Sequence, residues 1–225
     1  MDYSLYLPPS MLKTAFFTGH RKLTSSEIEH LTALLPGCIS DAYAHGYRTF
    51  LCGGALGFDT LAAKEILKMK NKLPDIRLSL AIPCPSQPDF WPVNDQIIYR
   101  DIVNQADEVK ILSQVYYQGV MHSRNRYMVE KSSLCICYLN NMRGGTAYTV
   151  RYALQYPYMN FINLAVYTSN RTDIMRESKW NCTYIFPSVF KNAGIVRLFH
   201  LSEKNHALKN TRKSFYLKQD SDSPK

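Results

Sequence analysis

A regular alternation of short apolar segments with helical segments constrains this chain most strongly. Between the apolar segments, hydrophobic residues recur with the period of an α-helix. Near-continuous apolar strands joined by helical crossovers are typical of a parallel sheet that is covered on both faces. We therefore predict an α/β fold with an open, mostly parallel sheet and helices on both faces. The expected strands are 14–18, 48–52, 78–82, 109–112, 134–138 and 161–166.

The helical segments carry local signals of their own. Thr24 and Glu27 have the spacing of a capping box, which predicts that a helix begins there. Pro36 lies inside the same segment, and we expect it to kink or restart that helix. The remaining helices are expected over 59–70, 95–105 and 119–131 and from about residue 146 to 156.

The chain divides into two regions. Residues 1–168 hold the alternating pattern and are predicted to form one domain. The pattern fades in residues 169–225, a C-terminal extension for which we expect one or two strands, at 184–186 and 196–199. Its basic end, rich in Lys, Asn, Ser and Asp, is predicted to be partly disordered.

Composition excludes several classes of protein. Hydrophobic residues make up 46% and charged residues 20% of the 225 residues, which are ordinary values for a globular protein. No apolar run is long enough to cross a membrane, and the start of the chain lacks the features of a signal peptide, so we expect a cytoplasmic protein without a membrane partner. The six cysteines include no CxxC pair, and we predict buried thiols and no metal site.

The charge balance indicates what the protein binds. Lys and Arg total 27 against 18 Asp and Glu, a formal net charge of +9. A positive protein favours anionic partners such as nucleotides or nucleic acid. No block of like charges occurs in the sequence. The net charge of +9 is therefore also explained by lysines and arginines that are scattered over the solvated surface and bind no partner.

Glycine is concentrated where strands are predicted to lead into helices. It permits turns at positive φ, and it lets a ligand approach the backbone next to the free amides of a helix N-terminus. Tight packing alone would also explain it. Neither the Walker pattern nor the GxGxxG pattern is present, which disfavours an ordinary ATPase or NAD dehydrogenase, and no cofactor is predicted. The glycines are Gly19, then Gly53, Gly54 and Gly57, then Gly144 and Gly145.

Polar and aromatic residues accompany these turns. Asp59 is interpreted as a helix-capping carboxylate or as an acceptor for a ribose hydroxyl, and Arg124 as a phosphate ligand or part of a solvated helix face. Trp91 and Tyr116 could stack on a base or simply pack at the rim. The other candidates are His20, Arg21 and Asn125, with Thr146 and Thr149 as helix-opening hydroxyls.

Four segments together resemble a known family. TGHR at 18–21, GGALGFDTLAA at 53–63, RN at 124–125 and GGTAYTV at 144–150 are similar to the YpsA-like (DUF1273) family of the SLOG superfamily. The superfamily includes the LOG cytokinin-activating hydrolases and the DNA-processing protein DprA. The resemblance covers roughly 13–168 and implies a Rossmann-like fold that binds nucleotides or nucleotide-derived ligands.

A fifth segment resembles the LOG hydrolases alone. MHSRNRYM at 121–128 is similar to their MHxRKxxM motif, in which the arginine, here Arg124, serves cleavage of the N-glycosidic bond of a nucleoside monophosphate. The glutamate of their PGGxGTxxE motif falls on Thr149. Glycosidic cleavage builds positive charge on the ribose, which a carboxylate stabilises and a threonine does not. Asp59, in the neighbouring loop, is the substitute that the sequence offers.

Three functions follow as hypotheses. The first is binding or sensing of a nucleotide-derived small molecule, a nucleoside phosphate or an ADP-ribose-like compound, at the glycine-rich edge of the sheet. The second is a phosphoribohydrolase or related N-glycosidase, with Arg124 and Asp59 as its catalytic candidates. The third is binding of single-stranded nucleic acid in the manner of DprA. Whether the chain is an enzyme stays open, as does a homodimer.

Overall fold

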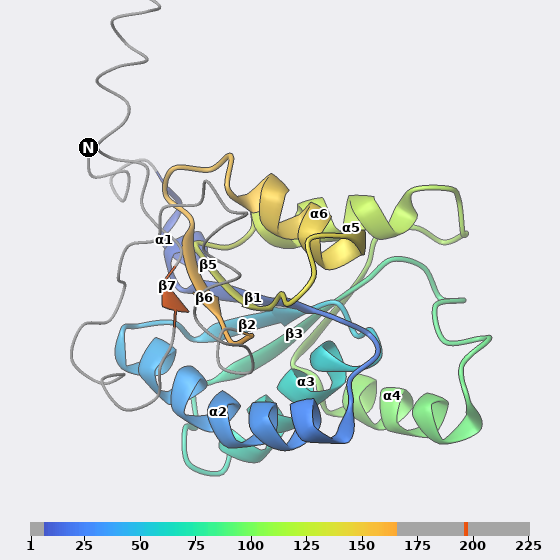
Figure 1. Ribbon diagram of the computed structural model, residues 1–225, viewed down its shortest axis with the longest axis horizontal. Helices are drawn as coiled ribbons and strands as arrows, with labels where there is room; N and C mark the ends of the chain where they lie inside the picture. Colours follow the sequence, from blue (N-terminus) through green and yellow to red (C-terminus); the bar gives the residue numbers. More distant parts are fainter. Residues whose placement is uncertain (1–6, 166–195, 198–225) are drawn as a thin grey trace, which may run out of the picture.

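The computed structural model describes residues 7–165 and 196–197. They form one seven-stranded sheet in the order β4-β3-β2-β1-β5-β6-β7 (Figure 1). Every neighbouring pair from β1 to β6 is parallel, and only β7 runs antiparallel, to β6. The strands are β1 (Thr14–Gly19), β2 (Thr49–Cys52), β3 (Arg77–Ile82), β4 (Glu108–Ile111), β5 (Leu134–Tyr138), β6 (Asn160–Asn163) and β7 (Val196–Arg197).

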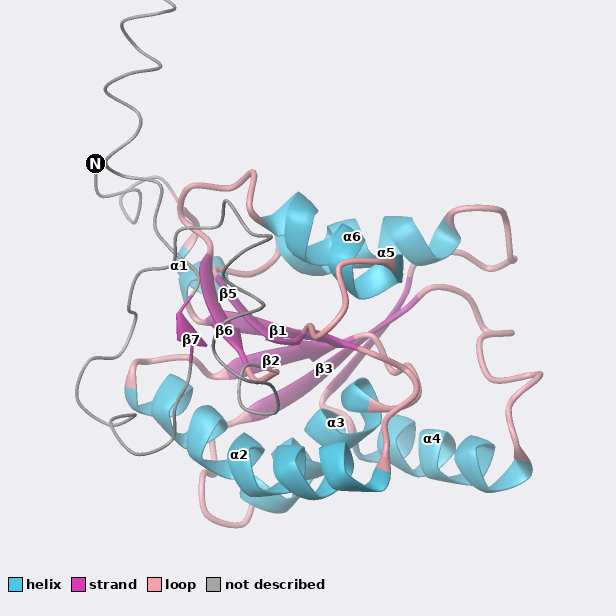
Figure 2. Cartoon of the chain, in the orientation of Figure 1, coloured by secondary structure: helices cyan, strands magenta, loops and turns pink. Residues whose placement is uncertain are grey.

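Helices cover both faces of this sheet. Figure 2 shows α2, α3 and α4 on one face and α5 and α6 on the other. The α/β fold with an open, mostly parallel sheet is therefore confirmed. The helices are α1 (Pro9–Leu12), which was not predicted, α2 (Ser25–Ala44), α3 (Phe58–Met69), α4 (Val93–Gln105), α5 (Val120–Glu130) and α6 (Gly144–Ala153).

The start of α2 is the predicted capping box. The Thr24 backbone amide donates to Glu27 Oε2 over 2.7 Å, and the Glu27 amide donates to Thr24 Oγ1 over 3.3 Å. The prediction that Pro36 restarts the helix was wrong, because α2 runs unbroken from Ser25 to Ala44. Leu35 and Cys38, on either side of the proline, are buried, so packing on the sheet compensates for the missing hydrogen bond.

Alternate residues of the strands fill two cores. Phe17 and Phe50 belong to the larger core and stack with their ring centroids 5.9 Å apart. Their neighbours Phe16 and Leu51 belong to the smaller core on the other face. This period of two, with both sides buried, explains why the strands read as continuous apolar runs in the sequence. Five cysteines are free and buried, Cys38, Cys52, Cys84, Cys135 and Cys137, and Cys182 lies outside the described residues.

Little of the predicted C-terminal extension can be compared with the structure. The strand expected at 196–199 corresponds to β7, which covers 196–197. The candidate strand at 184–186 and the basic end of the chain lie outside the described residues.

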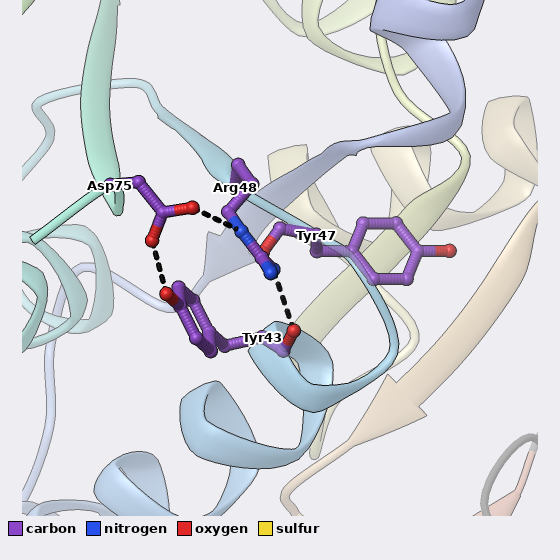
Figure 3. Close-up of polar contacts among 4 residues, drawn as sticks. All are labelled: Tyr43, Tyr47, Arg48 and Asp75. Atoms are coloured by element: carbon purple, nitrogen blue, oxygen red, sulfur yellow. Dashed lines mark hydrogen bonds and ion pairs between the residues drawn. The ribbon is translucent and has the colours of Figure 1, made fainter. Parts of the chain in front are cut away.

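A polar cluster lies at the amino edge of the sheet, where β2 and β3 begin (Figure 3). Arg48 Nε donates to Asp75 Oδ2 over 2.7 Å, and the Tyr43 hydroxyl donates to Asp75 Oδ1. Arg48 Nη1 donates to the carbonyl oxygens of Tyr43 and Tyr47 over 2.6 and 2.9 Å, and its guanidinium lies 3.8 Å from the centroid of the Tyr43 ring. The cluster therefore ties the end of α2 to the start of two strands.

Candidate functional site

The sheet topology brings the glycine turns to one edge. In the sheet, β2, β3 and β4 lie on one side of β1, and β5 and β6 lie on the other side. The strand order therefore changes direction at β1. In open parallel sheets, ligands bind at the carboxyl ends of the strands beside such a switch in strand order. The turns after β1, β2 and β5 all lie at this edge, as the parallel pairing requires.

At Gly53 the space beside the backbone is filled by the protein itself. A Cβ atom there would overlap the Arg124 guanidinium and lie 2.8 Å from Asp59 Oδ2. Arg124 Nη1 donates to the carbonyl oxygen of Gly53 and, over 3.5 Å, to that of Ala81. Glycine at 53 thus makes room for a buried arginine that arrives from α5.

The next turn residue, Gly54, has a φ of +61° and is also enclosed. A Cβ at this position would lie 2.9 Å from Ile82 Cδ1 and 3.3 Å from Tyr99 Cε2. Gln87, from the proline-rich loop after β3, donates through Nε2 to the carbonyl oxygens of Gly53 and Gly54, over 3.3 and 3.0 Å. Gln87 was not among the predicted site residues, because its partners are carbonyl oxygens of a turn more than thirty residues away in the sequence.

Gly19 and Gly57 let two loops pack against each other. A Cβ on Gly57, whose φ is +74°, would lie 2.5 Å from the carbonyl oxygen of His20. A Cβ on Gly19 would overlap the Phe58 side chain. The Phe58 amide donates to the carbonyl oxygen of His20 over 3.1 Å. At these two positions glycine serves close packing of the β1 and β2 turns.

The turn after β5 is open. Gly144, with a φ of +83°, and Gly145 are exposed and have nothing within 4 Å of a built Cβ. They begin α6, and no side chain caps that helix. Thr146 and Thr149 do not open it as predicted, because α6 already starts at Gly144. The Thr149 hydroxyl instead donates to the Gly145 carbonyl oxygen over 2.8 Å, inside the helix.

Asp59 and Arg124 face each other across Gly53 and are both 5% exposed. Burial raises the pKa of the Asp59 carboxyl, an effect that the Arg124 guanidinium opposes. Burial likewise lowers the pKa of Arg124, opposed by Asp59. Asp59 does not cap α3, whose first flanking residue is Gly57; its Oδ2 accepts from the Ala55 amide over 3.3 Å.

Two guanidinium groups act on this single carboxyl group. Arg21 is exposed and follows β1. Its positive charge lowers the pKa of the Asp59 carboxyl and also lowers the pKa of Arg124, so Arg21 lies near both side chains. Arg21 makes no ion pair within the described residues, and its Nη2 lies 4.0 Å from Met121 Sδ at the start of α5. Arg124 Nη2 likewise has no hydrogen-bond acceptor in the described part of the chain. Around Asp59, two guanidinium groups are therefore opposed by one carboxyl group.

Asn125 and His20 hold their neighbours in place. Asn125 Oδ1 accepts from Arg124 Nε over 2.8 Å and so fixes the plane of the guanidinium. His20 Nε2 accepts from the Asn140 amide over 3.3 Å, which links the β1 and β5 turns. Burial lowers the pKa of His20, opposed by nearby Glu27, so the imidazole is neutral at pH 7 and adds no charge.

The two aromatic candidates lie in different surroundings. Trp91 is half-buried and packs edge-on against Tyr99, with ring centroids 5.4 Å apart, and Tyr99 in turn borders Gly54. Tyr116 is 65% exposed and makes no ring contact or hydrogen bond with any described residue. Trp91 is thus joined to the glycine turns by packing, and Tyr116 is not.

Residues 7–165 and 196–197 show neither a metal cluster nor a membrane span. Within them, no group of three or more His, Cys, Asp or Glu side chains is arranged to hold a metal ion. No helix there is long and apolar enough to cross a membrane.

Comparison with known proteins gives one family. A sequence model of the YspA SLOG family (YpsA) matches residues 16–170. A UPF0398 protein of Bacillus cereus (strain B4264) is 26% identical over 140 residues, which are 60% of this chain and 76% of that protein.

Comparison with solved structures gives two DprA proteins. DNA processing protein A (DprA) of Streptococcus pneumoniae gives a TM-score of 0.51 at 14% identity, over 74% of this chain and 54% of that one. DprA of Helicobacter pylori, described with a single-stranded DNA binding mode, gives 0.46 at 21% identity, over 65% and 62%. This chain thus spans less than two thirds of either DprA, and the likeness to the Streptococcus pneumoniae protein concerns the fold alone.

Proposed function

Because this chain belongs to the YspA SLOG family, we propose that it binds a nucleotide-derived small molecule at the carboxyl edge of the sheet. The ligand class is a nucleoside phosphate or an ADP-ribose-like compound. The phosphate lies between Arg21 and Arg124 Nη2, and the exposed amides at the start of α6 provide further donors.

The observation that carries the proposal is the charge balance around Asp59. Arg21 and Arg124 are opposed there by one carboxyl group, and burial disfavours the charged form of that group. The other groups that act on Arg124 are Cys52 and Tyr99. Burial raises the pKa of both, so they are neutral at pH 7. Such a site is most stable with an anion bound.

Asp59 also offers an acceptor for the sugar. Its Oδ2 accepts from the Ala55 amide, and the Gly53 amide also hydrogen-bonds to the carboxyl group, which as a carboxylate can accept further hydrogen bonds. A carboxylate beside a phosphate site is a suitable acceptor for a ribose hydroxyl. This favours a nucleoside phosphate or an ADP-ribose-like compound over inorganic phosphate as the ligand.

Cleavage of the glycosidic bond is less well supported. At the LOG glutamate position stands Thr149, which is fully buried and donates to the Gly145 carbonyl oxygen. Asp59 would then have to stabilise the ribose cation, and burial disfavours its charged form. We therefore propose binding or sensing as the function, with hydrolysis as the alternative. Release of free adenine from AMP by the wild-type protein, lost in Asp59→Asn, would decide for hydrolysis.

Titration calorimetry with AMP, ADP-ribose and adenosine tests the binding proposal. We expect AMP and ADP-ribose to bind more tightly than millimolar and adenosine to bind at least tenfold more weakly, because it lacks the phosphate. Arg21→Gln should raise the Kd of AMP about tenfold to a hundredfold, the loss of one charge-assisted hydrogen bond. Lys22→Gln, also at an exposed residue in the same loop, is the matched control and should leave the Kd unchanged.

Two results would contradict the proposal. One is the absence of millimolar or tighter binding for every nucleotide. The other is the same Kd in Arg21→Gln and Lys22→Gln. An affinity for single-stranded DNA that falls steeply with salt, without nucleotide binding, would point to the DprA-like alternative instead.

A further inference from the structure

Exposed apolar side chains gather around one end of the sheet. Among the described residues, all the large exposed hydrophobic side chains except Ile28 and Met142 fall within residues 90–117. This segment comprises the end of the proline-rich loop, α4, β4 and the loop that follows β4. A concentration of this kind marks an interaction surface. Its members are Phe90, Val93, Ile97, Val109, Ile111, Val115, Tyr116 and Tyr117.

The surface contains an edge strand that pairs on one side only with described residues. β4 ends the strand order, and all four of its residues are exposed. In a parallel pair of strands, every second residue directs both its N–H and its C=O group toward the neighbouring strand, and the residues between them direct these groups away from it. The Leu112 amide donates to the Ile82 carbonyl oxygen over 2.9 Å, and Ile82 is in register with Ile111. The N–H and C=O groups of Val109 and Ile111 therefore point away from the sheet.

We propose that β4 pairs antiparallel with β4 of a second copy of this chain, about a two-fold axis at Val109. The outward N–H and C=O groups of Val109 then bond to the same groups of the second copy. Glu108 of each copy stands opposite Lys110 of the other, as a non-hydrogen-bonded pair with its side chains close together. The dimer thus contains two intermolecular ion pairs that come from one strand.

Charge also selects this register among the alternatives. An axis at Lys110 would place two lysines opposite each other, which is destabilising. A two-fold axis between Val109 and Lys110 would place Lys110 opposite Val109 and Glu108 opposite Ile111 of the second copy, so neither charged side chain would face an opposite charge. The sequence Glu108-Val-Lys110 is self-complementary in charge when it pairs antiparallel with itself. This favours a second copy of the chain as the partner, because pairing with an unrelated protein does not require such complementarity. The exposed side chains of Val115 and Tyr116, in the loop after β4, add apolar area beside the strands.

Sedimentation velocity of the full chain over a range of concentrations tests this interface. We expect a monomer–dimer equilibrium in which Glu108→Lys and Lys110→Glu each raise the dimer dissociation constant about tenfold or more, since two attractions become two repulsions. The double charge swap should restore the wild-type constant. Lys72→Glu, the same charge change at an exposed residue elsewhere, is the matched control and should have no effect.

Val109→Pro gives an independent check. It removes an N–H that points away from β3, so the sheet within one copy keeps its hydrogen bonds while the intermolecular pairing is lost. A chain that is monomeric at all concentrations would overturn the proposal. So would a dimer that Lys110→Glu and Lys72→Glu affect equally, or a charge swap that fails to restore dimerisation while each variant stays folded. Association with a different protein alone would overturn it as well.

Discussion

The two edges of the sheet each hold an arginine near an aspartate, with opposite consequences. At the amino edge, Arg48 contacts Asp75 directly, the Tyr43 hydroxyl donates to the other oxygen of the Asp75 carboxylate, and Arg48 Nη1 donates to the carbonyl oxygen of Tyr43 at the end of α2. At the carboxyl edge, Arg124 and Asp59 are buried across Gly53 without a direct ion pair between them. Arg48 thus donates directly to a carboxylate, whereas Arg124 donates only to uncharged acceptors in the described residues.

The difference shows in the pKa directions. Hydrogen bonds from Tyr43, with those from Arg48, lower the pKa of the Asp75 carboxyl. Burial raises the pKa of the Asp59 carboxyl despite the nearby guanidinium. The amino edge thus uses its charges to join elements, and the carboxyl edge keeps charges that its own groups do not neutralise. We infer that the carboxyl edge is the one that binds a ligand.

The largest effect is expected from removing the buried cation. Arg124→Met leaves the Asp59 carboxyl buried without its compensating charge, and we expect it to lower the free energy of unfolding by about 3 kcal/mol at pH 7. Arg48→Met, in the half-exposed cluster, should cost only about 1 kcal/mol. Urea denaturation of both variants measures the contrast. Equal losses would mean that the two edges do not differ as described.

The second prediction concerns the close packing at Gly53. A methyl group there overlaps the Arg124 guanidinium, so Gly53→Ala should destabilise the protein by about 2 kcal/mol. Gly37→Ala is the control, because Gly37 is exposed in α2 and has nothing within 4 Å of a built Cβ. It should stabilise the protein by about 0.5 kcal/mol, since alanine is the better helix former. Thermal unfolding that gives the same sign for both would refute the packing described at Gly53.

The smallest effect is a pair of opposite pH dependences. The pKa of Asp59 is raised on folding, so its contribution to stability is fully present below the unfolded pKa and is lost as the pH rises through the folded pKa. The pKa of Asp75 is lowered, so its contribution is present above the unfolded pKa and is lost as the pH falls through the folded pKa. Asp59→Asn and Asp75→Asn should therefore change the slope of stability against pH in opposite directions between about pH 3 and 6. Denaturation midpoints across this range measure both slopes, and slopes of the same sign would contradict the assignment.

The sequence predicted the order of elements well because its signals are local. Short apolar runs marked the strands, two of which lead directly into Gly19 and Gly53, and the capping box at Thr24 fixed the start of α2. Parallel pairing then brings Gly53 and Gly144 to one edge without further information. The start of α6 was misplaced by two residues, because the glycine-rich turn itself forms the first turn of that helix.

The space around each glycine could not be predicted from the local sequence. Gly53 and Gly144 follow strands in similar contexts, yet the first is filled by Arg124 and the second is open. The difference depends on a side chain that reaches from α5 over the end of β2, a contact between residues 71 positions apart. Gln87 was missed for the same reason, because its two acceptors are carbonyl oxygens of a distant turn.

A crystal structure of the full chain with AMP tests the central proposal most directly. We predict the phosphate within hydrogen-bond distance of Arg21 and of Arg124 Nη2, near the first amides of α6, with the ribose toward Asp59. A nucleotide found at the amino edge beside Arg48, or at the β4 surface with Arg21 and Arg124 unoccupied, would contradict it.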